Sequence, residues 1–219
     1  KETIITPAVD NTAVDEIEID AQIDYIDNNE QLPLPTGEVT ITITFADETT
    51  TTIPATITNG EIQTTTIPTE GKTGTATINI TYPGTEEYKP TETITTINIL
   101  TKTTLSITAD ETTISEGLIV QGFLETINED PINGQTITIT ATYDDDYVDE
   151  FTATTEEDGT YQTTVPAHKT GTVTIIATFD ETETYAASED TTTTTITENE
   201  PKETIITPAV DNTAVDEIE

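Results

Sequence analysis

The sequence predicts an all-β fold, built as β-sandwiches in tandem with about seven strands each. Three observations lead to this prediction. Apolar residues alternate with polar ones along most of the chain, residues typical of tight turns separate the alternating stretches, and two kinds of repeat divide the sequence. Period-two alternation indicates half-buried strands, and turns at a spacing of about 8–12 residues are typical of sandwiches.

The alternation is clearest where Ile and Val alternate with Thr. Residues 38–45 read EVTITITF, which places the apolar side chains on one face and the Thr side chains on the other, and residues 136–143 follow the same pattern. Residues 17–25 also alternate, with Glu, Asp and Gln on the polar face. Val, Ile and Thr are branched at Cβ, and this favours strands over helices. We therefore expect a thin Ile/Val core between sheets whose outer faces of Thr, Asp and Glu stay hydrated.

Turn residues separate these stretches. Asn59-Gly60 predicts a hairpin, because both residues tolerate positive φ, and Glu157-Asp158-Gly159 predicts a second one. Pro131-Ile132-Asn133-Gly134 predicts a further bend. The strands expected in the first half are 3–6, 17–25, 38–45, 49–57, 61–67, 74–82 and 92–100. Those expected in the second half are 103–108, 118–125, 136–143, 149–155, 160–165, 172–179 and 190–198.

The sequence contains a repeat within a repeat. Residues 202–219 are identical to residues 1–18, which indicates a longer protein with near-identical units of 201 residues. Inside the unit, Lys72-Thr73-Gly74-Thr75 matches Lys169-Thr170-Gly171-Thr172. We therefore expect one domain at 1–101, a second at 102–201, and the first strand region of the next repeat at 202–219. Four apolar residues of that last segment need a packing partner: Ile205, Val210, Val215 and Ile218.

The composition excludes several classes of protein. The chain has 43 acidic residues against 6 lysines and carries a net charge of −37. Binding to nucleic acid requires a basic surface, so we expect no nucleic-acid partner. No apolar run is long enough to span a bilayer, so we expect no direct membrane insertion. Cysteine is absent, which excludes disulfides and thiol chemistry.

Turn and aromatic motifs recur in both halves. The second half has Pro131-Ile132-Asn133-Gly134, Asp158-Gly159-Thr160-Tyr161, Lys169-Thr170-Gly171, Phe179 and Tyr185, and the first half has Tyr82-Pro83-Gly84 followed by Tyr88-Lys89-Pro90. These motifs resemble the tandem immunoglobulin-like (Ig-like) repeats of prokaryotic adhesin-like surface proteins, and the closing motif is similar to that of group 3 bacterial Ig-like domains. The acidic, Thr-rich composition resembles that of such surface proteins in methanogenic archaea. The resemblance implies Ig-like sandwiches at the cell surface.

Three positions are candidate sites. Calcium takes six to eight oxygen ligands, and an acidic loop crowds five carboxylates together: Asp144, Asp145, Asp146, Asp149 and Glu150. The second candidate calcium site is a domain joint, where Asp10, Asp15 or Glu16 would meet Glu198 or Glu200 of the preceding domain. Asn79-Ile80-Thr81 is a glycosylation sequon, and Asn79 is expected to face outward.

Catalytic motifs are missing. Gly71-Lys72-Thr73 lacks the earlier glycine of a phosphate-binding loop, and no Ser-x-x-Lys accompanies Lys169-Thr170-Gly171, so both predict a structural turn. His168 is expected to be an exposed loop residue. We therefore expect no enzyme, but a structural repeat in a rod-like stalk or fibre of an extracellular, cell-surface adhesin.

Neighbouring repeats of the same protein are the expected partners. Two alternatives stay open: a self-assembling extracellular filament, in which segment 202–219 adds a strand to an identical chain, and a glycan- or protein-binding Ig-like module.

Overall fold

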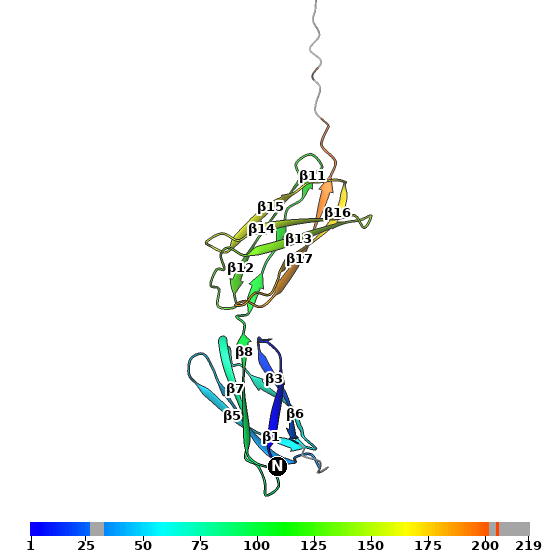
Figure 1. The fold of residues 1–219 in the computed structure, drawn as a ribbon. Coiled ribbons are helices and arrows are strands. Elements are labelled where there is room, and N and C mark those ends of the chain that lie inside the picture. The colour runs from blue at the N-terminus through cyan, green and yellow to red at the C-terminus, as the bar shows by residue number, and fades with distance from the viewer. Residues whose placement is uncertain (27–32, 202–204, 206–219) are drawn as a thin grey trace, which may run out of the picture.

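The computed structural model describes residues 1–26, 33–201 and 205. All of its elements are β-strands, and they form two bodies that lie end to end (Figure 1). This confirms the all-β prediction of tandem sandwiches. In the part of the chain that the structure describes, no helix has the length and apolar character needed to cross a membrane.

The first sandwich is one curled sheet. Its strands follow the order β1-β3-β6-β5-β4-β7-β8-β2, and the two halves of the sheet enclose a single core. The hairpin predicted at Asn59-Gly60 is confirmed: both residues have positive φ, and β5 pairs with β6 on either side of the turn. The strands are β1 (Thr3–Val9), β2 (Thr12–Ala13), β3 (Glu16–Tyr25), β4 (Gly37–Thr44), β5 (Thr50–Thr58), β6 (Glu61–Pro68), β7 (Gly74–Tyr82) and β8 (Thr91–Ile99).

The second sandwich has two separate sheets. One contains β12 paired with β9, β10 and β15, and the other has the order β11-β17-β16-β13-β14. Glu157-Asp158-Gly159 forms a tight turn, but the predicted hairpin is wrong, because the strands on either side belong to different sheets. The strands are β9 (Thr103–Leu105), β10 (Thr108–Ala109), β11 (Thr112–Thr113), β12 (Leu118–Thr126), β13 (Thr136–Tyr143), β14 (Val148–Thr154), β15 (Thr160–Val165), β16 (Gly171–Phe179) and β17 (Ser188–Thr197).

Each sandwich has its own core. One cluster runs from Ile5 to Ile99 and the other from Leu105 to Ile196, and each consists mainly of the alternating Ile and Val rows. Burying one such side chain stabilises the fold by roughly 1.5–3 kcal/mol, so these rows supply most of the favourable free energy. The domain limits 1–101 and 102–201 stay a prediction, and so does the unit at 202–219. Of that segment only Ile205 is among the described residues, and it is 84% exposed.

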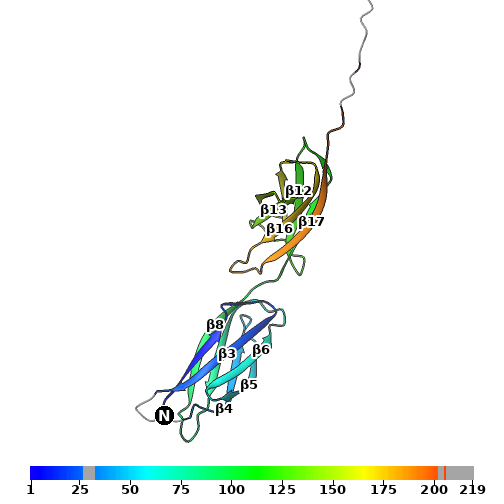
Figure 2. The same cartoon turned by 90° about the vertical axis from the view of Figure 1, so that its right-hand side faces the viewer.

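The first strand of the second sandwich is interrupted. The sequence predicts one strand over 103–108, whereas the structure has β9 and β10 with Ser106 and Ile107 between them. The carbonyl of Ser106 turns inward and accepts a 2.6 Å hydrogen bond from the buried hydroxyl of Tyr161. The amide of Ile107 donates to the Asp190 carboxylate on β17. Figure 2 shows β12 and β17, the strands that flank this break.

Candidate functional site

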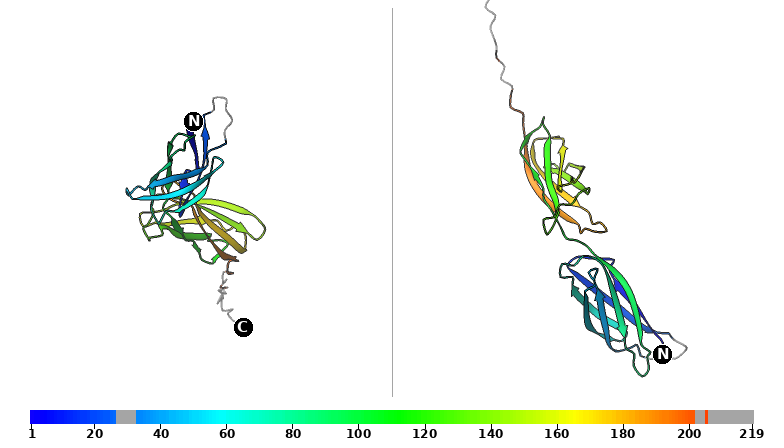
Figure 3. Two further views of the ribbon diagram at one scale, coloured as in Figure 1. Left: turned by 90° about the horizontal axis from the view of Figure 1, so that it is seen from below. Right: turned by 90° about the vertical axis from the view of Figure 1, so that its left-hand side faces the viewer.

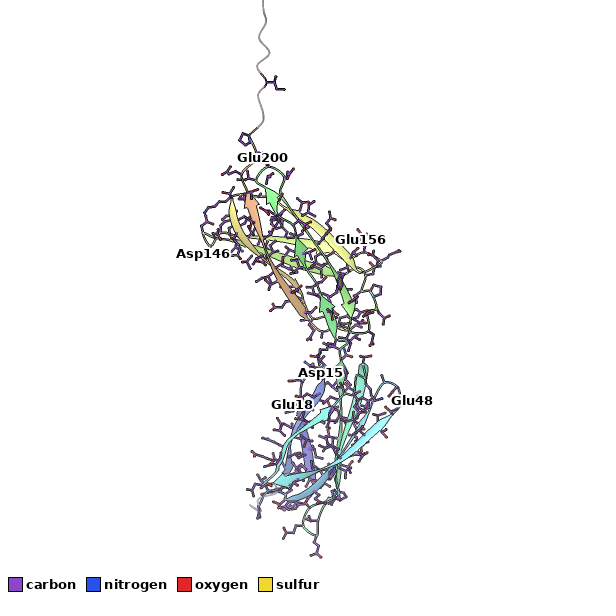
Figure 4. All side chains as sticks on the ribbon, turned by 180° about the vertical axis from the view of Figure 1, so that it is seen from behind. Asp15, Glu18, Glu48, Asp146, Glu156 and Glu200 are labelled. Atoms are coloured by element: carbon purple, nitrogen blue, oxygen red, sulfur yellow. The ribbon has the colours of Figure 1, made fainter. Side chains whose placement is uncertain are left out.

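The predicted calcium loop forms the tip of the β13–β14 hairpin. Asp146 has a positive φ of 62° there (Figure 4). Asp144 accepts a hydrogen bond from the amide of Thr172, and Asp145 pairs with Lys169 at 2.8 Å. Both carboxylates therefore have partners of their own on the neighbouring β16 side of the sandwich.

The other two carboxylates of the loop lie on strand β14. Asp149 lies 2.9 Å from Nε2 of His168, and Glu150 stands opposite Thr140 and is exposed. Within residues 1–26, 33–201 and 205, no group of three or more His, Cys, Asp or Glu side chains is arranged to hold a metal ion. Calcium binding stays a prediction.

The same hairpin tip occurs in the first sandwich. The amide of Phe45 donates to the carbonyl of Thr49, as the amide of Tyr143 does to that of Tyr147. Glu48 has a positive φ, as Asp146 does. The acid–lysine pair recurs as well. In the first sandwich Lys72 lies 2.7 Å from Asp47 and stands over the ring of Phe45.

The role of the Lys-Thr-Gly motif follows from this comparison. Lys72 lies just before β7, and Lys169 lies just before β16. Each lysine pairs with an aspartate at the tip of the neighbouring hairpin and holds that tip in place. The hydrogen bond from Lys72 lowers the pKa of Asp47 to about 2, with a further contribution from Thr49. The hydrogen bond from Lys169 also lowers the pKa of Asp145.

The second sandwich adds an aromatic cluster to this frame. The rings of Tyr143, Tyr147 and His168 lie 5.5–6.1 Å apart in tilted and edge-on contacts. They line a shallow depression of about 400 Å³ together with Asp145 and Lys169. His168 is half exposed, but it is packed against these rings, which the expectation of a simple loop residue did not include.

Most polar groups of this cluster have partners inside it. Tyr143 donates to the carbonyl of Pro166, and a hydrogen bond to Asp149 raises the pKa of Tyr147. His168 is at ion-pair distance from Asp149, although the contact lacks the alignment of a hydrogen bond. The arrangement therefore fixes the loop before β16 to the hairpin, and Asp149 Oδ2 is buried there without a hydrogen-bond partner.

The sequon residue Asn79 lies on β7, in the middle of the sheet between β4 and β8. Asn79 is partly buried, and its Oδ1 accepts a hydrogen bond of 3.4 Å from Thr81. Glycosylation at Asn79 stays a prediction.

The joint between the sandwiches is the second notable region. Leu100 is buried, and its amide donates to the carbonyl of Ala13 in the first sandwich. The next residue, Thr101, bonds only into the second sandwich: its amide donates to Thr184, and its carbonyl accepts from Ala186. Consecutive residues thus belong to different sandwiches, and no free residue lies between them. The right-hand view of Figure 3 shows the single crossing segment from a further direction.

Three side-chain contacts bridge the joint. Lys102 pairs with Asp15 at 2.9 Å, Thr12 donates to Glu181, and the amide of Asn98 donates to the carbonyl of Glu183. The ion pair is largely exposed, and such pairs contribute only about 0–1 kcal/mol each. These contacts fix the orientation of the sandwiches more than they stabilise the fold.

The position of Asp15 corrects one expectation. The sequence places Asp15 near the start of the unit, where it would meet Glu198 or Glu200 of a preceding domain. Strands β1 and β3 run the length of the sandwich, and the turn between them carries Asp15 to the opposite end. Figure 4 shows Asp15 at the joint and Glu200 at the far end of the second sandwich. Asp15 therefore faces Lys102 and not an acidic residue of a preceding domain.

Comparison with known proteins gives likenesses of fold only. No family model matches the chain, and no curated protein matches it. A solved tetra-tandem repeat from the extending region of a large adhesion protein is 19% identical, with a TM-score of 0.37, over 90% of this chain and 49% of that one. Fibronectin(III)-like modules of Clostridium thermocellum CbhA are 14% identical, with a TM-score of 0.41, over 93% of this chain and 100% of that one.

Another similar structure is trypsin-activated alpha-2-macroglobulin from Escherichia coli, which is 12% identical with a TM-score of 0.37. That match covers 89% of this chain and 15% of that protein, so this chain spans only a small part of it. The chain also spans about half the length of the tetra-tandem repeat. Likenesses at this level say nothing about what the chain binds. The resemblance to group 3 bacterial Ig-like domains and to archaeal proteins stays a prediction.

Proposed function

We propose that the chain is a non-enzymatic structural repeat in a rod-like stalk of an extracellular, cell-surface adhesin. The joint at Leu100 and Thr101 carries the proposal, because it holds two sandwiches end to end without a free linker residue. A spacer needs such joints to keep its direction over many domains. The identity of residues 202–219 with 1–18 supports neighbouring repeats of the same protein as its partners.

The surface chemistry also supports a spacer. The outer faces of the strands carry mainly Thr, Asp and Glu, and the net charge of −37 opposes collapse of one repeat onto another. A broad depression on the first sandwich lies over β1, β3 and β6, and its lining residues include no aromatic side chain. Sugar platforms use aromatic rings, and the rings of the depression at Tyr143, Tyr147 and His168 pack against one another, so a glycan-binding module has less support.

Small-angle X-ray scattering of residues 1–219 over a hundredfold range of concentration tests the proposal. A stalk segment should stay a monomer, with a maximum dimension that fits two sandwiches end to end at every concentration. Concentration-dependent fibres that disappear in a chain of residues 1–201 would instead support strand complementation through 202–219. A compact particle would overturn the stalk, and specific capture of one glycan on an array would favour the binding module.

A further inference from the structure

The N-terminal end of the first sandwich is built to dock on another domain. We propose that its partner is the C-terminal end of a preceding copy of the second sandwich, and that this joint between units is looser than the joint inside a unit. The inference rests on the proposed function, since it takes the chain as part of a tandem array. Residues 202–219 enter it only through their identity with 1–18.

The two sandwiches have the same construction at their N-terminal ends. The nitrogen of Lys1 donates to Glu87, and its carbonyl accepts from Lys89. Thr101 makes the corresponding bonds to Thr184 and Ala186 in the second sandwich. In the second sandwich, the end with these bonds is the one that contacts the first sandwich. The matching end at Lys1 is therefore shaped to receive a preceding domain.

Further pairs extend this correspondence. Thr3 donates to the carbonyl of Lys89, as Thr103 does to that of Ala186. The carbonyls of Glu2 and Lys102 accept hydrogen bonds from Ile26 and Ile127 in the same way. These pairs identify which residue of the first sandwich stands at each position of the joint.

The ion pair of the internal joint is not repeated between units. Glu2 of a following unit stands at the position of Lys102. The turn that holds Asp15 in the first sandwich holds Ser115 and Glu116 in the second. In the first sandwich the Glu2 carboxylate pairs with Lys89 at 3.1 Å, so this position of a following unit offers Glu116 no lysine of the kind that Lys102 offers Asp15.

The two other side-chain contacts are not repeated either. Thr182 and Tyr185 form the turn bonds that Thr85 and Tyr88 form, so Glu181 corresponds to Gly84, which has no side chain to accept a hydrogen bond. Ile196 is paired with the first glycine of β16 as Ile99 is with that of β7. The donor Asn98 is accordingly replaced by Thr195, whose shorter side chain lacks an amide group.

The linker between units is also longer. Inside the unit, Thr101 follows Ile99 by two residues, whereas Lys202, which is identical to Lys1, follows Ile196 by six. The four additional residues are 198–201, and all of them are exposed, whereas Leu100 is buried. Four extended residues add a reach of about 13 Å. A side-chain hydrogen bond of 2.7 Å from Ser115 to Asn199 attaches the start of this linker to its own sandwich. Length and lost contacts between the sandwiches thus act in the same direction.

The result is a stalk in which stiff joints inside the units alternate with loose joints between them. Each pair of sandwiches inside a unit forms one stiff segment, and successive segments swivel at residues 198–201. The stiff length is then the 201-residue unit and not the single domain. Such a stalk combines reach with a freely oriented tip.

Double electron–electron resonance, which measures the distance between two spin labels, tests this inference on a chain of two consecutive units. The chain has no cysteine, so spin labels can be attached at Thr96→Cys and Thr193→Cys, which are exposed positions on β8 and β17. One labelled pair spans the internal joint of the first unit. The other pair spans the joint between units, with the second label at position 96 of the following unit. We expect the distance distribution across the joint between units to be at least twice as wide.

Two matched variants locate the cause. Deletion of residues 198–201 should narrow the wide distribution, and insertion of the same four residues after Leu100 should widen the narrow one. Equal widths at both joints, or no response to these variants, would overturn the inference and leave the stalk intact. A second distance that disappears on dilution with unlabelled chain would come from another molecule, and this result would count against the stalk itself.

Discussion

At the scale of single residues, the break between β9 and β10 depends on Gly122. The carbonyl of Ser106 projects into the sandwich, and a Cβ on residue 122 would lie 1.9 Å from that oxygen and 2.7 Å from the hydroxyl of Tyr161. The first sandwich has Ala21 at the corresponding position of β3, where no such carbonyl intrudes. Glycine is therefore required by the inward carbonyl and not by the strand.

Gly122→Ala should destabilise the second sandwich by about 1–3 kcal/mol, the usual cost of overpacking a core. Urea unfolding followed by tyrosine fluorescence measures the effect. Ala21→Gly in the first sandwich is the control, and it should cost about 1–2 kcal/mol through added backbone freedom and the loss of one buried methyl group. An unchanged midpoint for Gly122→Ala would mean that Ser106 can move aside without loss, contrary to the close packing described for it.

At the scale of elements, each hairpin tip is held by one lysine, and Asp47 carries a testable consequence. Its pKa is about 2 in the folded chain, chiefly because of the hydrogen bond from Lys72, and close to 3.8 without such partners. A lowered pKa means that the contribution of this carboxylate to stability is fully present above about pH 4 and is lost as the pH falls towards 2.

Asp47→Asn should therefore lower the thermal midpoint by a constant amount above pH 5, and the difference from the unmodified chain should shrink between pH 4 and pH 2. Calorimetry across this range measures it. Glu48→Gln removes a carboxylate from the same turn and corrects for the change in net charge. A difference that stays constant down to pH 2 would show that the Lys72 contact does not act through the charge of Asp47.

Much of the fold could be predicted from local pattern. Rows such as 38–45 alternate strictly, and Asn59-Gly60 has the residues that a two-residue hairpin requires, so their strands and turn were predicted correctly. The short strands β2, β10 and β11 were not predicted, because two residues carry no period and their pairing is decided by distant strands. The inward turn at Ser106 was missed for the same reason.

The candidate sites were harder to predict. The Lys-Thr-Gly motif was interpreted correctly as a structural turn, since it recurs in both halves, but its acidic partner lies about 25 residues away across the sheet. The joint contacts connect residues more than 80 positions apart. Nothing in the local sequence indicates that Lys102 meets Asp15. The matching hydrogen bonds of the two sandwiches show which residues occupy equivalent positions.

At the scale of the whole molecule, charge should limit stability, since 43 carboxylates oppose the compact state. Raising NaCl from about 0.01 to 1 M shortens the screening length from about 30 to 3 Å, so the thermal midpoint should rise. A thermal midpoint that falls with NaCl would contradict repulsion as the limiting term.

Calcium held at residues 144–150 would add a rise beyond that of magnesium at equal ionic strength, and a chelator would remove it. Asp146→Asn should then weaken the calcium response alone. Equal responses to both cations would leave screening as the whole effect and end the calcium proposal.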